Sequence, residues 1–250
     1  QRLLNSFEKN KDRLPLFPQV RLHTTQTLHH QFPDCSPFNV CFEINPVYSV
    51  LFPNLLQFLY EYLKEKGVSF LFNTELHSIE STHPGLKLDT SMGQYQTESL
   101  ILATGTESRF FVPHLLIESI PGMILIFQLT RPLSFAISAS GHAVPLANNQ
   151  CAVGAIPSPL EEWIEEEQEQ KLKAKAIELI PHLAQANCLR RWIGKRAVYS
   201  PEREPLVGAI PSQQGLYVLT GFASKGLLWI PQTASLLAQS LTGAHVTFPN

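Results

Sequence analysis

The sequence predicts a mixed α/β protein of two parts, in which a mainly antiparallel sheet covers a second, α/β part. Three observations lead to this prediction. A helix with apolar residues at three-to-four spacing runs from Pro53 to Gly67. Residues 99–105 have the apolar composition of a strand that is buried on both faces. Between residues 123 and 155, short apolar runs are separated by Gly and Pro, as in an antiparallel sheet.

The composition is that of an ordinary globular protein. The 250 residues are 44% hydrophobic and 16% charged, enough for one large core or two small ones. The formal net charge of -2 provides no excess of positive charge to attract a phosphate backbone, which argues against DNA binding and against general nucleic-acid binding. Four cysteines without a C-x-x-C pair, no signal peptide and no apolar run of transmembrane length predict a cytoplasmic protein with reduced thiols.

The first half of the chain combines one helix with several short strands. Pro53 suits the first turn of the helix, and Gly67 suits its end. Residues 68–72 then alternate as a strand. Three further short strands are expected, at residues 76–79, 86–88 and 94–97, the last two as a hairpin.

No metal site is assigned. Residues 1–46 show no sustained period, so we expect loops and short strands there. His29 and His30 are adjacent and point to different sides of any regular element, which favours structural histidines over a metal pair. The charge run at residues 161–175 is typical of a solvated helix face.

The middle of the chain predicts an antiparallel sheet followed by a helical segment. Strands are expected at residues 123–129, 134–138, 143–146 and 150–155. A helical segment follows at residues 160–187, with acidic residues early and lysines later. Pro181 should kink or divide this helix.

Near the C-terminus a strand, a glycine-bounded loop and a helix follow one another. The strand spans residues 215–221, and Pro231 precedes a helix at residues 232–241. Gly221 and Gly226 let the backbone turn sharply, and N–H groups at a helix start can hold electronegative ligand atoms. The pattern favours a ligand site, although such a loop taken alone is more often only a tight turn.

Seven blocks together carry a resemblance to a known family. In chain order they are Phe52-Pro53 with the helix to Gly67, and residues 68–79, 100–105, 121–122, 194–196, 205–208 and 221–226. The combination resembles flavin-dependent oxidoreductases of the D-amino-acid oxidase type. The tail is similar to the oxidase domain of the bifunctional enzyme that trims carboxymethylaminomethyl-uridine at the tRNA wobble position, and nearly as similar to glycine oxidase.

The resemblance implies two discontinuous domains. An FAD/NAD(P)-binding-type, three-layer domain would comprise residues 47–105 and 191–250, without its first βαβ segment. A substrate-type domain with an antiparallel sheet would comprise residues 1–46 and 106–190.

The same resemblance implies which residues meet the cofactor and the substrate. Arg196 matches the arginine of the family's G-x-R-P block, which in several members grips the substrate carboxylate. Lys225 would lie near the flavin edge where negative charge builds on reduction. For both residues, the alternative interpretation is an ordinary surface cation without a role in the site. The full set expected around FAD is Leu76 near the adenine, Ala103, Thr104 and Gly105 beside the dinucleotide, and Gly221, Phe222, Ala223, Ser224, Lys225, Gly226, Leu227 and Leu228 around the flavin ring. No general base is assigned, because hydride transfer to a flavin needs none.

The sequence also departs from the family pattern. It contains no G-x-G-x-x-G segment and no acidic partner for the adenosine ribose. Ala197 follows Arg196 where the family usually has Pro, and Ser224 stands where glycine oxidase has a second arginine. We therefore expect these residues to be one piece of a longer flavoenzyme; a remnant or variant chain is the alternative.

Three functions follow from these expectations. The first is an FAD-dependent oxidoreductase that oxidises the C–N bond of a small amino acid or substituted amine to an imine. The second is oxidation of a tRNA wobble-uridine side chain, which the modest charge does not favour. The third is a non-catalytic binding or assembly protein that cannot hold FAD. The sequence leaves the substrate, the electron acceptor and the oligomeric state open.

Overall fold

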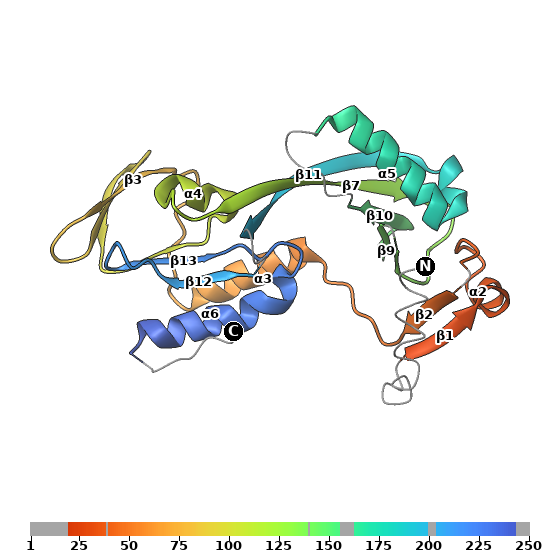
Figure 1. Cartoon of the computed structure of the whole chain (residues 1–250), viewed down its shortest axis with the longest axis horizontal. Coiled ribbons are helices and arrows are strands. Elements are labelled where there is room, and N and C mark those ends of the chain that lie inside the picture. The colour runs from red at the N-terminus through yellow and green to blue at the C-terminus, as the bar shows by residue number, and fades with distance from the viewer. Residues whose placement is uncertain (1–19, 39, 140, 156–162, 200–203, 244–250) are drawn as a thin grey trace. The chain divides into compact units, whose positions relative to one another are not determined.

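The computed structural model describes residues 20–38, 40–139, 141–155, 163–199 and 204–243 (Figure 1). Its elements, in chain order, are β1 (Val20–Thr24), α2 (Thr25–Gln31), β2 (Val40–Ile44), α3 (Phe52–Glu65), β3 (Leu76–Ser81), β4 (Leu86–Thr90), β5 (Gly93–Thr97), β6 (Leu100–Leu102), η2 (Gly105–Glu107), α4 (Ser108–Phe111), β7 (Ile117–Gln128), β8 (Ile137–Ser138), β9 (His142–Leu146), β10 (Gln150–Gly154), α5 (Glu165–Leu179), η4 (Pro181–Gln185), β11 (Asn187–Tyr199), β12 (Leu206–Ala209), β13 (Leu216–Thr220) and α6 (Gly226–Leu241).

The chain divides into two compact units. Unit 1 comprises Gln1–Val68, Met123–Ile156 and Ile164–Trp192, and unit 2 comprises Ser69–Gly122, Pro157–Trp163 and Ile193–Asn250. The long strands β7 and β11 each contribute residues to both units. The mixed α/β class expected from the sequence is confirmed, while the expected domain bounds, residues 1–46 with 106–190 and residues 47–105 with 191–250, stay a prediction.

Unit 1 is organised around antiparallel strands. The five-stranded sheet has the order β11-β7-β10-β9-β8, and β10 is antiparallel to both β7 and β9. Helix α5 contacts β9 and β10 and buries Leu172, Ala176 and Leu179, while its acidic first turn stays on the outside. Pro181 divides the helical segment at the predicted place, because α5 ends before it and η4 begins with it.

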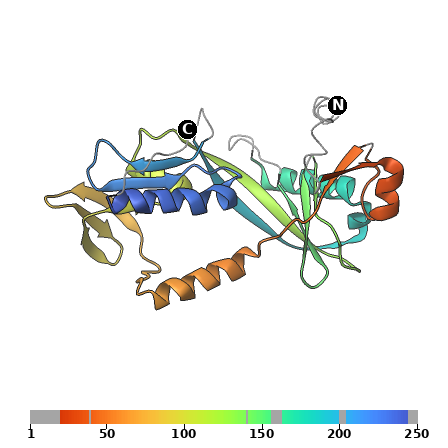
Figure 2. The same ribbon diagram turned by 90° about the horizontal axis from the view of Figure 1, so that it is seen from below.

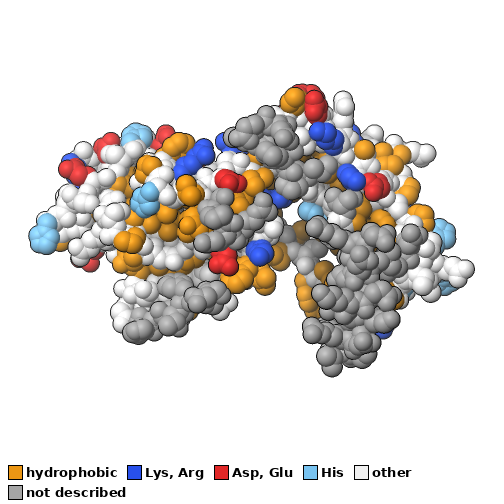
Figure 3. Space-filling model, viewed as in Figure 1, with side chains coloured by type: hydrophobic (Ala, Val, Ile, Leu, Met, Phe, Trp, Pro, Cys, Tyr) orange, Lys and Arg blue, Asp and Glu red, His pale blue; other side chains and the backbone are white. Residues whose placement is uncertain are grey.

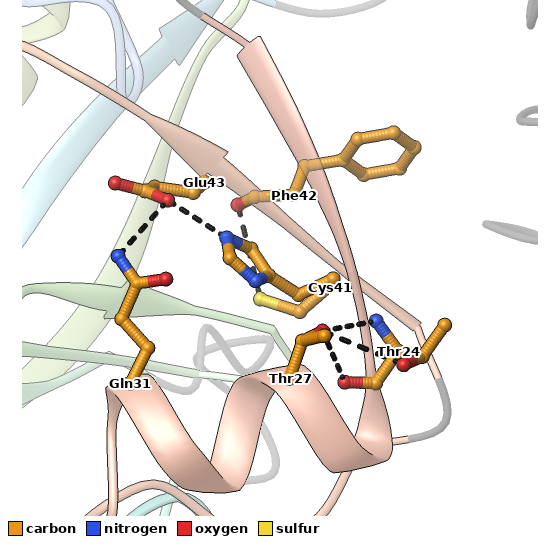
Figure 4. A network of polar contacts seen from close by, with 7 residues as sticks. Thr24, Thr27, Gln31, Cys41, Phe42 and Glu43 are labelled. Carbon is orange, nitrogen blue, oxygen red and sulfur yellow. Dashed lines mark hydrogen bonds and ion pairs between the residues drawn. The ribbon is translucent and has the colours of Figure 1, made fainter.

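A network of polar side chains connects α2 to the antiparallel strand pair β1–β2 (Figure 4). His23 Nε2 lies 2.7 Å from Glu43 Oε2, and Gln31 on α2 donates to the same carboxylate oxygen at 3.5 Å. Thr24 and Thr27 form a capping box at the start of α2. The sequence shows no sustained period in this region and does not predict α2. Local capping and one buried side chain, Leu28, stabilise this short helix.

Unit 2 contains two three-stranded sheets. One has the order β12-β13-β6, with β12 antiparallel and β6 parallel to β13. The other is the antiparallel meander β3-β4-β5. Helix α6 lies along the first sheet, where it contacts β12 (Figures 1 and 2). The core of the unit is a cluster of buried side chains: Leu86, Leu102, Val112, Ile210, Leu216 and Val218.

Two predictions about burial and pairing were wrong. Residues 68–72 form no strand, since a strand needs a neighbour to pair its backbone groups and none of the described strands takes that place. Strand β6 is not buried on both faces: Leu102 is 1% exposed but Ile101 is 42% exposed. Helix α3 forms as predicted, yet none of its side chains is buried, and it stands clear of the sheets of unit 1 (Figure 2).

Three element bounds also differ from the sequence prediction. The expected strand at residues 134–138 is reduced to β8, because only Ile137 and Ser138 pair with β9. The helical segment expected at residues 160–187 begins with α5 at Glu165, and its residues 160–162 lie outside the described residues. Helix α6 begins at Gly226 and contains Pro231, whose missing N–H costs one helical hydrogen bond near the exposed start of the helix.

Strand β6 provides a matched pair of substitutions for testing this core. Leu102→Ala should lower the free energy of unfolding by about 2–5 kcal/mol, because it leaves a cavity among fully buried side chains. Ile101→Ala, one residue away but half exposed, should cost about 1 kcal/mol or less. Urea denaturation followed by circular dichroism measures both, and equal losses would contradict the assigned burial.

Candidate functional site

The candidate site lies where two parallel strands of unit 2 end. Strands β6 and β13 run in register, with Leu100 opposite Leu216 and Leu102 opposite Val218, so their carboxyl ends meet at one edge of the sheet. In open α/β sheets this edge is where ligands bind. A glycine in the left-handed region follows each strand, Gly105 at φ +60° and Gly221 at φ +78°.

A buried hydrogen bond joins these two strand ends. Thr220 Oγ1 donates to the carbonyl oxygen of Gly105 at 3.0 Å, and the Thr220 side chain is buried. On the Gly105 side, Thr104 Oγ1 lies 2.9 Å from the buried Ser108 Oγ. The structure thus brings together the expected segments 103–105 and 221–226, which are far apart in the sequence.

The two glycines have different surroundings. A Cβ on Gly221 would lie 3.3 Å from Tyr199 Cβ and 3.4 Å from the Leu206 backbone nitrogen, so this glycine is required by close packing. A Cβ on Gly105 would meet nothing within 4 Å. The open space at Gly105 leaves its backbone accessible to a ligand.

Arg196 is placed beside the loop after Gly221. The N–H of Ala223 donates to the carbonyl oxygen of Ala197 at 3.0 Å, and Val198 forms an isolated antiparallel bridge with Phe222. These contacts connect β11 to the loop directly next to Arg196, which is half-buried. The two residues that follow Arg196 in β11 therefore contact the predicted loop, and a role of Arg196 itself in the site stays a prediction.

The other cations of β11 have different environments. Arg191 Nη1 lies 3.0 Å from Glu169 Oε2, and its Nη2 lies 3.2 Å from Glu165 Oε2, so this guanidinium is held by the acidic start of α5. These carboxylates raise the pKa of Arg191, and hydrogen bonds from Lys173 and Arg191 lower the pKa of Glu169. Lys195 is exposed.

The start of α6 carries an unusual arrangement of charge. Lys225 occupies the N-cap without a side-chain capping bond, and the first turn contains no acidic residue. Its carbonyl oxygen accepts hydrogen bonds from the N–H groups of Leu228 and Trp229, at 3.0 and 3.1 Å. A cation at the positive end of a helix dipole is unfavourable for folding, so this end of α6 is suited to an electron-rich ligand.

The remaining predicted residues divide into two kinds. Ala103, Thr104, Ser224, Leu227 and Leu228 are exposed at or next to the two strand ends. Leu76 instead lies on β3, where it pairs with Thr90 and packs against the core cluster of unit 2. Its expected place near an adenine stays a prediction.

Sequence reasoning missed two features of unit 2. The sequence pattern places Thr220 only in a strand. A hydroxyl residue directly before a glycine at a strand end is a signal that could have pointed to its role in joining the two strand ends. A surface pocket of about 510 Å³ was also not foreseen, and none of the predicted site residues lines it. Its lining is Arg109, Phe110, Pro113, Leu115, Leu116, Ile117 and Glu118.

Neither a metal-binding cluster nor a membrane-spanning helix is found among the described residues. No group of three or more His, Cys, Asp or Glu side chains is placed to hold a metal ion there. His29 and His30 are both exposed on α2. Within the same ranges, no helix combines the length and the apolar character needed to cross a bilayer.

Comparison with known proteins identifies the family. The family model described as FAD dependent oxidoreductase matches residues 21–240. The chain belongs to this family. Glycine oxidase from Pseudomonas putida is 27% identical over 171 residues, which cover 63% of this chain and 45% of the relative. The chain spans about half the length of the curated relatives that it matches first, 45% and 51%.

Two further similarities concern the fold and a tRNA-related relative. The crystal structure of glycine oxidase from Geobacillus kaustophilus superimposes with a TM-score of 0.82 at 23% identity, covering 92% of this chain and 65% of that chain. A tRNA 5-methylaminomethyl-2-thiouridine biosynthesis bifunctional protein from Thiobacillus denitrificans is 49% identical over 43 residues, 17% of this chain and 7% of that protein. The fold predicted from the family resemblance is confirmed.

The hydrogen bond between the two strand ends can be tested by an isosteric substitution. Thr220→Val should lower the free energy of unfolding by about 1–2 kcal/mol, because the Gly105 carbonyl loses its donor. Thr233→Val is the matched control: its hydroxyl donates only to carbonyls of its own helix, at Trp229 and Ile230, so the loss should be about 0.5 kcal/mol or less. Thermal or urea unfolding compares the two variants. A Thr220 variant as stable as the control would show that this hydrogen bond does not stabilise the site.

Thiol reactivity tests the burial of the four cysteines, which are all free. Burial raises the pKa of the Cys35 and Cys151 thiols to about 11, from a usual value of 9.0. At pH 8 this lowers their thiolate fraction about a hundredfold. Burial raises the pKa of the Cys41 and Cys188 thiols as well, but these two side chains are only half-buried, so iodoacetamide should modify them first. Mass spectrometry of timed samples follows each site. Equal rates in the folded protein would contradict the assignment, and equal rates in urea provide the control.

Proposed function

We propose that this chain forms part of an FAD-dependent oxidoreductase that oxidises the C–N bond of a small amino acid or substituted amine. The product is an imine, which water hydrolyses. The observation that supports it most strongly is the grouping of Gly105, the loop after Gly221 and Arg196 at the carboxyl ends of two parallel strands. The proposed enzyme is larger than these 250 residues, since its curated relatives are about twice as long as the part matched here. We place it in the cytoplasm.

The residues at the two strand ends fit a flavin dinucleotide. The open backbone at Gly105 allows a phosphate or ribose to approach closely. The N-terminus of α6, with Lys225, offers positive charge to the electron-rich edge of an isoalloxazine ring. When FAD is bound, its ring supplies the hydride acceptor. Phe222, Ala223 and Ser224 form the turn between Gly221 and this helix end and would line the ring.

Arg196 is the proposed substrate ligand. A guanidinium holds a carboxylate by two parallel hydrogen bonds, which orients the adjacent carbon as well as binding it. On the same strand, Arg191 is already paired with Glu165 and Glu169, whereas no ion pair of Arg196 is seen within the described residues. Hydride transfer requires the reacting carbon to be held close to the hydride acceptor. Arg196 would therefore raise the rate by orienting the substrate.

Oxidation of a tRNA wobble-uridine side chain is the second candidate. It is supported by the 49% identity to the tRNA biosynthesis protein, which is well above the 27% found with glycine oxidase but extends over only 43 residues. The net charge of -2 gives no general basis for RNA binding. A third candidate, a non-catalytic binding or assembly protein, requires that FAD is not held at all.

The visible absorption spectrum decides first between the enzyme and the non-catalytic protein. The polypeptide that naturally contains these residues should show flavin bands that survive gel filtration in the presence of added FAD. Glycine or a D-amino acid should then bleach those bands under anaerobic conditions, whereas bleaching only by tRNA carrying the modified uridine would favour the second candidate. A colourless protein that ignores FAD would overturn the oxidoreductase proposal.

Arg196 can be tested against its neighbour. Arg196→Gln should lower kcat/KM for an amino-acid substrate about a hundredfold or more, since each hydrogen bond to a charged group contributes about 1.5–3 kcal/mol. The flavin spectrum should stay unchanged. Lys195→Gln removes an adjacent, exposed charge and should leave kcat/KM within about twofold. An Arg196 variant as active as the Lys195 variant would exclude the proposed carboxylate contact.

A further inference from the structure

The surface pocket of unit 2 lies outside the candidate site at the two strand ends. Its volume is about 510 Å³, and its lining extends along the chain from Arg109 on α4 to Glu118 on β7. Pockets of about 300–1,000 Å³ are typical of small-molecule sites in proteins. None of the residues expected to contact FAD or the substrate carboxylate lines this pocket, so a molecule bound in it would occupy a separate site.

Most of the pocket lining is apolar. Ile117 is buried and Leu115 packs against the core cluster of unit 2, so this part of the lining belongs to the folded core. Phe110 and Leu116 are instead 64% and 62% exposed. Figure 3 shows hydrophobic and basic side chains next to each other on the surface over α4. Large apolar side chains that line a concave surface favour a ligand with an apolar group.

Arg109 provides the positive charge of the pocket. Its guanidinium carbon lies 5.3 Å from the centroid of the Phe110 ring, a cation–π contact that holds the guanidinium over the ring. The residue is half-buried, and among the described residues no ion pair of Arg109 is found. A guanidinium has five N–H donors in a planar fork, and the ring contact supplies no oxygen acceptor for them. Arg109 can therefore bind a carboxylate by two parallel hydrogen bonds.

Glu118 provides the opposite charge. It is exposed on β7, and within the described ranges it forms no ion pair with Arg109 or with any other cation. Two opposite charges that line one pocket without pairing are complementary to a molecule that carries both charges. In an α-amino acid, the carboxylate and the ammonium group are attached to one carbon, which also carries the side chain. An amino acid with an apolar side chain therefore matches both the charges and the apolar lining.

We propose that this pocket is an amino-acid site separate from Arg196, and that it binds a zwitterionic α-amino acid with an apolar side chain. The carboxylate binds to the Arg109 guanidinium, the ammonium group binds to the Glu118 carboxylate, and the side chain packs against Phe110 and Leu116. A simple carboxylate or a simple amine would use only one of the two charges. The proposal does not rest on the proposed function, because binding in this pocket needs neither flavin nor turnover.

Isothermal titration calorimetry tests the proposal. The protein is the polypeptide that naturally contains these residues, with Arg196→Gln so that the proposed substrate contact does not contribute, and the probes are L-leucine and D-leucine. At least one enantiomer should bind saturably. Isocaproate, which lacks the ammonium group, and isoamylamine, which lacks the carboxylate, should each bind at least about tenfold more weakly. Saturable binding of neither enantiomer, or binding of isocaproate or isoamylamine as tight as that of leucine, would overturn the proposal.

Two variants and a control locate the binding. In the same background, Arg109→Gln and Glu118→Gln should each raise the dissociation constant for leucine at least about tenfold, since each removes one charged partner. Glu118 is exposed, so its variant covers the case in which the Arg109 variant does not fold. Arg190→Gln removes an exposed arginine outside the pocket and should change the constant less than about twofold. Equal affinities of all three variants would contradict binding in this pocket, whereas a lack of flavin bands would count only against the proposed function.

Discussion

The parallel pairing of β6 with β13 is the constraint on which the rest of unit 2 depends. It fixes two strand ends side by side, and everything assigned to the site follows from that edge. The glycines after each strand turn the chain away at positive φ, and the buried Thr220 hydroxyl holds the two turns together. The loop after Gly221 is then bonded to β11 through Ala223 and Ala197, the residue that follows Arg196. Without the strand pair, none of these groups would be neighbours.

Local sequence patterns were sufficient to predict the elements that depend only on residues close together in the chain. The amphipathic helix α3, the break at Pro181 and the glycine after each strand end could be predicted, because each depends on residues within one turn or one strand. The site could be assembled only through the family resemblance, because pairing between β6 and β13 leaves no trace in either segment alone. The start of α6 was placed six residues late, since Pro231 is a strong but not absolute helix breaker.

The wrong predictions share a physical cause. Residues 68–72 and 99–105 have compositions that suit a sheet with neighbours on both sides, and the described residues supply fewer neighbours than those compositions require. Helix α3 shows the same mismatch, with Phe58 65% exposed on a helix of apolar spacing. The composition of a segment predicts the surroundings that suit it, and does not predict whether the described part of the chain supplies them.

The separation of β6 from β13 in the sequence has a consequence for synthesis on the ribosome. Thr220 and the Gly105 carbonyl that it binds are 115 residues apart. At roughly 5–20 residues per second, strand β6 emerges about 6 to 23 seconds before β13 exists. During that interval β6 lacks β13, the strand with which it pairs in the structure. Until β13 is made, the β13 side of β6 is therefore open to pairing with other extended segments.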